Sequence, residues 1–145
     1  MNKITIRRLR LEDVDSISKI QESITKVPVS SDFKQIIREH APKAEEASFV
    51  AEIEGKVVGY MISYILSGSF GMDKNAWIAQ FGVDPKYMGQ GIGKGLAEEI
   101  FKFYKGRGIN TIFTSVRWDS TDLLSFFKTL GFDRSNFINL RKVLA

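Results

Sequence analysis

The stretch from residue 76 to residue 104 constrains the fold of this chain most, because it combines a strand, a glycine-rich loop and a helix. Residues 76–83 (AWIAQFGV) are apolar at nearly every position, which is typical of a strand covered on both faces. Pro85 ends this strand, since proline lacks an amide donor and has a fixed φ. Beyond the glycines, apolar residues recur at the spacing of an amphipathic helix: Ile92, Leu96, Ile100 and Phe103.

Four glycines lie within seven residues between the strand and the helix: Gly89, Gly91, Gly93 and Gly95. The N-terminus of a helix carries unpaired amides and about half a positive charge, so it attracts anions. Glycine lets a phosphate approach the backbone because no Cβ stands in the way. A helix that merely packs on a strand does not require so many glycines, which cost conformational entropy. The loop is therefore predicted to hold a phosphate.

Two common nucleotide motifs do not fit this spacing. A P-loop needs a serine or threonine after Gly-Lys, but Gly95 follows Gly93 and Lys94. A dinucleotide fingerprint needs a third glycine three residues after Gly-x-Gly, where this chain has Lys94 or Leu96. Both of these nucleotide sites are excluded for the loop.

The segment resembles the acyl-CoA loop of the GCN5-related N-acetyltransferases, the GNAT superfamily. In that family the strand ends in Val-x-Pro and the helix opens with Arg/Gln-x-x-Gly-x-Gly/Ala. Val83 and Pro85 occupy the first set of positions here, and Gly91 and Gly93 occupy the second. Met88 departs from the pattern, because the family has Arg or Gln there. Since relatives hold the CoA pyrophosphate mainly through backbone amides, the resemblance implies that binding survives this change.

The resemblance implies acetyl-CoA as the co-substrate and no metal. Backbone groups of residues 81–83 would pair with the pantetheine arm, and an amide there would polarise the thioester carbonyl. The implied acetyl-CoA-binding residues are Phe81, Gly82, Val83, Met88, Gly89, Gln90, Gly91, Ile92, Gly93 and Lys94, together with Ser120 and Phe127 from a second motif.

The family's second motif, Asn-x-x-Ala-x-x-Phe/Leu-Tyr-x-x-x-Gly-Phe, is matched in spacing but not in its polar residues. Counting back from Gly131, Ser120 stands at the Asn position and Phe127 at the position of the tyrosine that protonates the CoA thiolate in many relatives. Phe127 cannot donate a proton, so Ser120 or a water would have to, or the thiolate would leave without help. Phe127 is as consistent with a core residue as with one that also packs against the pantetheine.

No general base can be named from the sequence. An alkyl amine with a pKa near ~10.4 must lose a proton before it attacks. Some relatives use a glutamate where this chain has Ser115. The pattern favours a helix cap for Asp119 and a solvated charge pair for Glu45-Glu46 over a role as base, and His40 is expected to be structural. The candidates by location are Gln80, Asp73, Asp119, Glu45 and Glu46.

The predicted fold class is α/β (α+β), the GNAT fold, as a single domain over residues 1–145. It has a mixed central sheet of six or seven strands with about four helices in the order βααβββαβαβ(β). The helices are expected after caps at Asp13 and at Ser30 or Ser31, from Ile92 to a glycine end at 106–108, and after a cap at 119–121. The strands are expected at residues 5–9, 48–53, 56–66, 76–83, 109–116 and 137–143, with a hairpin turn at Glu54-Gly55.

Composition limits the class of protein. The 145 residues are 43% hydrophobic, enough for one core that buries roughly two-thirds of the unfolded surface. The absence of cysteine excludes disulfides, thiolate metal sites and a cysteine nucleophile. No signal peptide and no apolar run of about 18 residues occurs, so we expect a cytoplasmic protein without a membrane partner. The net charge of +4 favours anions such as CoA, but the dispersed lysines and arginines argue against nucleic acid.

The resemblance implies an acetyl-CoA-dependent N-acetyltransferase. It would transfer acetyl to a primary amine of a small molecule, peptide or protein by direct attack in a ternary complex. The alternative is an acyl-CoA-binding sensor of the same fold that has lost its chemistry, which Met88, Ser115 and Phe127 motivate. The acceptor surfaces are expected at residues 27–46 and 67–75, and a homodimer is left open.

Overall fold

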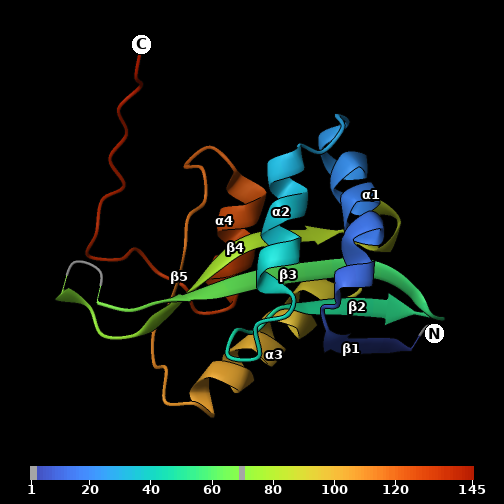
Figure 1. Ribbon diagram of the computed structural model, residues 1–145, viewed down its shortest axis with the longest axis horizontal. Helices are drawn as coiled ribbons and strands as arrows, with labels where there is room; N and C mark the ends of the chain where they lie inside the picture. Colours follow the sequence, from blue (N-terminus) through green and yellow to red (C-terminus); the bar gives the residue numbers. More distant parts are fainter. Residues whose placement is uncertain (1–2, 69–70) are drawn as a thin grey trace. The chain divides into compact units, whose positions relative to one another are not determined.

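A five-stranded sheet with helices on both faces forms the first part of the molecule (Figure 1). The computed structural model describes residues 3–68 and 71–145, which divide into two units between Ser115 and Val116. Within the described residues of the first unit, β1 to β4 are successively antiparallel and β5 is parallel to β4. The strands lie in the order β1 (Ile4–Arg8), β2 (Phe49–Ile53), β3 (Lys56–Leu66), β4 (Asn75–Val83) and β5 (Ile112–Thr114).

The prediction of six or seven strands is wrong, because the described residues form five. The strand expected at 109–116 is reduced to the three residues of β5, and residues 137–143 form no strand. Apolar alternation gives a segment the propensity for a strand, but a strand also needs a partner edge. The large apolar side chains of this last segment are exposed instead: Phe137, Ile138, Leu140, Val143 and Leu144.

Helices cover the two faces of the sheet differently. Figure 1 shows α1 (Val14–Thr25) and α2 (Ser31–His40) on one face and α3 (Ile92–Lys105) on the other. Successive residues of β3 confirm this, since Tyr60 packs its ring edge-to-face on Phe33 of α2, whereas a Cβ at Gly59 would lie 2.7 Å from Ile92 of α3. The core beneath α1 and α2 comprises Leu9, Val14, Ile17, Ile20, Phe33, Ile37, Val50, Val57, Tyr60 and Ile62.

The first two helices begin in different ways. The cap predicted for α2 is confirmed, because the Ser30 hydroxyl accepts a hydrogen bond from the Phe33 amide at 3.2 Å. Asp13, in contrast, makes no such bond to α1. Its buried carboxylate accepts two hydrogen bonds from the Arg7 guanidinium, at 2.9 and 2.8 Å, and one from the Arg10 amide at 2.8 Å. The prediction of an Asp13 cap is therefore wrong, because Arg7 of β1 and the Arg10 amide take the carboxylate.

The hairpin between β2 and β3 has the predicted turn. Glu54 and Gly55 both have positive φ, of 52° and 78°, which is the pattern of a type I′ turn. The end of α3 lies within the predicted 106–108 segment. Gly108, with φ of 74°, is the left-handed residue, and the Ile109 amide bonds back to the carbonyl of Tyr104 at 3.0 Å.

The second unit contains α4 (Thr121–Thr129), so four α-helices lie in the described chain, as predicted. Gly131, with φ of 93°, ends α4. The Phe132 amide donates to the carbonyl of Phe127 at 3.1 Å, and their rings meet edge-to-face at 5.2 Å. This is the Schellman ending, in which an apolar contact accompanies the left-handed glycine.

Candidate functional site

The glycine loop leaves β4 and enters α3 through two left-handed glycines. A short 3-10 turn (Pro85–Tyr87) follows the strand, and the carboxylate of Asp84 accepts a hydrogen bond from the Lys86 amide at 3.0 Å. Gly89 and Gly91 have φ of 80° and 78°, a conformation that other residues adopt only with strain. A Cβ at either glycine would meet no atom within 4 Å, so the space above both residues is open.

The amides at the start of α3 have no partners within the described part of the chain. Gly91 occupies the N-cap position, where it has no side chain to offer, and the first helical bond runs from the Gly95 amide to its carbonyl at 3.0 Å. No hydrogen bond from residues 88–94 to another described residue satisfies these amides. Unpaired amides at a helix N-terminus form an anion site. The loop can therefore bind an anion, as predicted from its glycines.

Two further glycines bring α3 close to the sheet. A Cβ at Gly59 of β3 would lie 2.7 Å from the Ile92 side chain, and one at Gly95 would lie 2.9 Å from Ile6 of β1. A Cβ at either position would require the neighbouring isoleucine side chain to shift. The two glycines thus let the first turn of α3, which follows the glycine loop, pack closely on the sheet.

One edge of β4 opens beyond Ile78. β4 pairs with β3 along its whole length, but its pairing with β5 covers only Ala76 to Ile78. The register on β3 shifts at this point, from Ile62 opposite Gln80 to Ser63 opposite Ile78, which leaves Ala79 as a bulge.

The bulge determines which backbone groups face the open edge. Before it, the Ala76 amide donates to Thr111 beside β5; after it, the Asp84 amide donates to Val58 of β3 at 2.8 Å. Since backbone groups alternate along a strand, Gly82 faces β3 as Asp84 does, whereas Phe81 and Val83 face the open edge. Residues 81–83, predicted to bind the pantetheine, thus include two whose backbone groups face that side.

Gly82 itself is closed off on the face of α1. A Cβ there would lie 2.8 Å from a ring carbon of Tyr60, 3.0 Å from its hydroxyl and 3.1 Å from Ile24. Tyr60 is fully buried and donates to the side chain of Gln21 in α1 at 2.7 Å. Burial raises the pKa of Tyr60 well above its ordinary value, so the hydroxyl stays protonated. The sequence analysis missed Tyr60; a tyrosine within the apolar run of β3 was the available signal.

The candidate bases are distributed over the chain. Gln80 lies opposite Ile62, on the face covered by α1 and α2, and its amide is not basic. Asp73 is exposed, in the loop whose residues 69–70 lie outside the described residues. Asp119 belongs to the second unit and pairs with the Arg117 guanidinium at 2.9 Å in two exposed hydrogen bonds. Hydrogen bonding by Arg117 holds the pKa of Asp119 below its ordinary value, which weakens it as a base.

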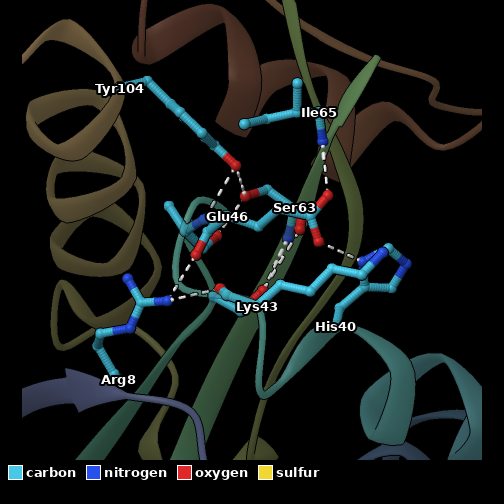
Figure 2. A network of polar contacts seen from close by, with 9 residues as sticks. Arg8, His40, Lys43, Glu46, Ser63, Ile65 and Tyr104 are labelled. Atoms are coloured by element: carbon cyan, nitrogen blue, oxygen red, sulfur yellow. Dashed lines mark hydrogen bonds and ion pairs between the residues drawn. The ribbon is translucent and has the colours of Figure 1, made fainter. Parts of the chain in front are cut away.

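Glu46 is not the solvated charge that its neighbour Glu45 is, so that reading of the pair is wrong. Glu46 is only 4% exposed. Figure 2 shows its carboxylate between His40 and Ile65, with the His40 Nδ1 atom at 2.6 Å and the Ile65 amide at 2.9 Å. The neighbouring residues form a ring of hydrogen bonds in which the Ala47 amide donates to the Tyr104 hydroxyl, at 2.9 Å, and Tyr104 meets Ser63 at 2.6 Å. Ser63 closes the ring on the Ala47 carbonyl.

Ser120 and Phe127 both belong to the second unit. Ser120 precedes α4, where its side chain makes no capping hydrogen bond. Phe127 is 6% exposed and packs edge-to-face against Phe126 and Phe132, at 5.1 and 5.2 Å. Phe127 is therefore a core residue of its unit; its predicted contact with the pantetheine stays a prediction.

Comparison with known proteins gives the class of this protein. The model of the Acetyltransferase (GNAT) family matches residues 14–132. The chain therefore belongs to the GNAT family, and it is an N-acetyltransferase. Among the described residues, no helix is both long and apolar enough to cross a membrane.

Individual relatives agree with this assignment. An N-alpha-acetyltransferase of Sulfurisphaera tokodaii is 31% identical over 134 residues, which cover 88% of this chain and 78% of that protein. A mycothiol acetyltransferase of Amycolatopsis mediterranei is 30% identical over 93 residues, 62% of this chain but only 31% of that protein. The structure of an aminoglycoside N-acetyltransferase in complex with CoA has a TM-score of 0.82 at 14% identity, over 100% of this chain and 97% of that one. This last likeness shows the fold alone.

Proposed function

We propose that this acetyltransferase uses acetyl-CoA and acetylates a primary amine by direct attack in a ternary complex. The observation that carries the proposal is the set of unpartnered amides at the start of α3, next to two left-handed glycines with open space above them. Residues 88–94 would hold the diphosphate through these amides. Phe81 and Val83, whose backbone groups face the open edge of β4, would hold the pantetheine arm.

The transfer itself needs few side chains. The amine nitrogen attacks the thioester carbonyl carbon, the nitrogen loses a proton, and the CoA sulfur leaves with the bonding electrons. A backbone amide of the open edge would stabilise the oxyanion that forms at the carbonyl. A thiol pKa near ~8.5 makes the thiolate a tolerable leaving group, so the step can proceed without a proton donor such as the tyrosine that Phe127 replaces in the resembled motif.

We propose the α-amine of a peptide or protein as the acceptor. Two candidate bases are engaged elsewhere, since Glu46 is buried against His40 and Asp119 is paired with Arg117. An α-amine has a pKa of about 7.7–8.0, whereas a lysine side chain has about 10.4, so only the α-amine is substantially deprotonated near neutral pH without a base. The similarity to an N-alpha-acetyltransferase over 78% of that protein supports the same choice.

A pair of glycine variants tests the donor site. Gly91 and Gly55 both have φ of 78°, and a Cβ at either meets nothing within 4 Å, so G91V and G55V introduce the same backbone strain. We expect G91V to weaken acetyl-CoA binding in calorimetry about a hundredfold, because the loop amides are displaced, and G55V to bind as the wild type does. A folded wild type that does not bind millimolar acetyl-CoA would contradict the proposal.

A second experiment tests the reaction. Release of free CoA thiol is followed with peptides that carry a free N-terminus and with acetyl-blocked peptides that carry only a lysine side chain. We expect turnover with the first set and little with the second. Binding of acetyl-CoA without thiol release from any amine would instead identify a sensor.

Two further expectations stay predictions: one domain over residues 1–145 and a cytoplasmic location. The oligomeric state, for which the sequence left a homodimer open, is not tested.

A further inference from the structure

The carboxylate of Glu46 joins two segments that lie in or next to the acceptor surfaces expected from the sequence. His40 is the last residue of α2, in the predicted 27–46 wall, and Ile65 is near the end of β3, just before the predicted 67–75 wall. Glu46 Oε1 lies 2.6 Å from His40 Nδ1, and Oε2 accepts from the Ile65 amide at 2.9 Å (Figure 2). A single buried side chain thus connects the end of the helix to the end of the strand.

The contact continues from His40 across the sheet to the open edge. The imidazole of His40 lies 5.7 Å from the ring of Tyr64. Tyr64 is the cross-strand partner of Trp77 in β4, and the Trp77 ring stacks on Phe113 of β5 at 4.9 Å. We call His40, Tyr64, Trp77 and Phe113 the aromatic row.

The aromatic row ends next to the point where β4 and β5 separate. Trp77 and Phe113 are in the last stretch where the two strands still pair, directly before the Ala79 bulge. Tyr64, Trp77 and Phe113 are each partly exposed. Their side chains lie on the same face of the sheet as that of Gln80. This is the face opposite to α3.

The position of this row is sensitive to Glu46. The carboxylate has two partners on two elements, and it is buried, so loss of its charge leaves the His40 nitrogen and the Ile65 amide poorly satisfied. Arg8 holds the same loop from the other side, since it donates to the backbone carbonyls of Lys43 at 3.0 Å and Glu46 at 2.7 Å. The loop backbone is therefore held independently of the carboxylate, which leaves His40 and Ile65 as the groups that Glu46 controls.

We propose that Glu46 is a positioning residue of the acceptor side, which sets acceptor affinity by fixing the aromatic row beside the open edge of β4. This inference rests on the proposed function. It predicts that a change at Glu46 alters the binding of the acceptor but not that of acetyl-CoA. The reason is that the glycine loop, which would hold acetyl-CoA, makes no contact with Glu46 among the described hydrogen bonds and ion pairs.

The test compares E46Q with E99Q by steady-state kinetics on an N-terminal peptide amine and acetyl-CoA. Glu99 is a matched control, since its exposed carboxylate pairs only with Lys102 at 3.5 Å on α3. For E46Q we expect the KM of the peptide to rise about tenfold, with the KM of acetyl-CoA and kcat within about twofold of the wild type. For E99Q we expect no change in any of the three.

A second variant protects the test from misfolding of E46Q. H40F keeps a ring against Tyr64 but removes the nitrogen that binds Glu46, at a side chain that is 14% exposed, compared with 5% for Glu46. We expect the same selective rise in the KM of the peptide. Equal changes in the KM of both substrates, or no change in either variant, would overturn the proposal.

A readout without turnover separates this inference from the proposed function. The chain has two tryptophans, and Trp118 is 86% exposed, so in a W118F background the emission reports Trp77 alone. We expect E46Q and H40F to shift this emission and to speed hydrogen exchange at the Ile65 amide. If the wild type shows no turnover, the proposed function fails and the acceptor role with it, while unchanged emission and exchange would show that Glu46 does not fix the row.

Discussion

The glycine loop and the contacts around Glu46, both in the first unit, are built from different kinds of groups. We call the latter the Glu46 network, which comprises His40, Glu46, Ala47, Ser63, Ile65 and Tyr104. The loop presents backbone amides, left-handed glycines and open space, and most of its residues are exposed. The network consists of buried side chains that reach across 41 residues of sequence, as Ser63 does to Tyr104. The comparison indicates that the proposed donor side depends on φ angles and tolerates side-chain change, whereas the proposed acceptor side depends on the chemical identity of single side chains.

The largest expected effect is at Gly82, where the backbone of the open edge lies against a single side chain, that of Tyr60. A Cβ would lie 2.8 Å from the buried ring of Tyr60, which has no free space to move into. We expect G82V to lower kcat/KM about a hundredfold, because the open edge of β4 is displaced. G106A is the control, since Gly106 has a helical φ of −65° and its nearest neighbour would be 3.4 Å away. Near-normal activity of folded G82V would show that the open edge tolerates displacement.

The next effect concerns the buried carboxylate of Asp13 at the start of α1. The glycine loop depends on backbone groups and has no buried ion pair of this type among the described contacts. Burial acts to raise the pKa of Asp13, but hydrogen bonds from Arg7 and from the Arg10 amide outweigh it and hold that pKa below its ordinary value. A lowered folded-state pKa means that this stability is present above pH ~4 and is lost as the pH falls further. We expect D13N to lower the free energy of unfolding at pH 7 by about 3 kcal/mol and to flatten its decline in acid.

Denaturant unfolding between pH 2 and pH 7 measures both effects. D15N is the control, since Asp15 is exposed in the first turn of the same helix. A D13N protein whose acid limb matches that of the wild type would indicate that other carboxylates control acid unfolding.

A smaller effect is expected at Tyr104, which tests the hydrogen-bonded ring of the network. Without the hydroxyl, the fully buried Ala47 amide loses its partner. We expect Y104F to lower the free energy of unfolding by about 2 kcal/mol, measured in urea, while the Kd of acetyl-CoA stays within about twofold. Y87F is the stability control, because no described hydrogen bond involves the Tyr87 hydroxyl. Weaker acetyl-CoA binding by Y104F would show that the glycine loop and the Glu46 network are not independent.

The smallest effect is expected for D119N. The Asp119 carboxylate is exposed and paired with Arg117, and its lowered pKa makes it a weak base near neutral pH. We expect kcat/KM and its pH profile to stay within about twofold of the wild type. Loss of an ascending limb in the D119N profile would identify Asp119 as the base.

Features that depend on nearby residues could be predicted from the sequence. The Ser30 cap, the Glu54-Gly55 turn and the glycine loop each involve a few consecutive residues, whose chemistry fixes the local φ angles. The motif of the glycine loop also pointed to the family, which the match over residues 14–132 confirms.

Features that depend on distant partners could not be predicted in this way. Asp13 has the right position for a cap, but Arg7 takes its carboxylate. Glu46 lies in a polar stretch, yet it is buried by His40 and Ile65. The expected last strand at 137–143 has the apolar pattern but no partner edge in the described structure. In each case the local structure was decided by which groups the fold brings next to the residue. The periodicity of the sequence does not contain that information.

The bulge at Ala79 has a consequence for how β4 can vary. On either side of Ala79 the strand pairs with consecutive residues of β3, since Ile78 lies opposite Ser63 and Gln80 opposite Ile62. Deletion of Ala79 would therefore join the two parts into one regular ladder, in which Phe81 and Val83 still point away from β3. The deletion would remove only the bend and the added twist that a bulge introduces, so a relative that lacks this residue should keep the direction of its backbone groups and differ in the course of the strand beside β5.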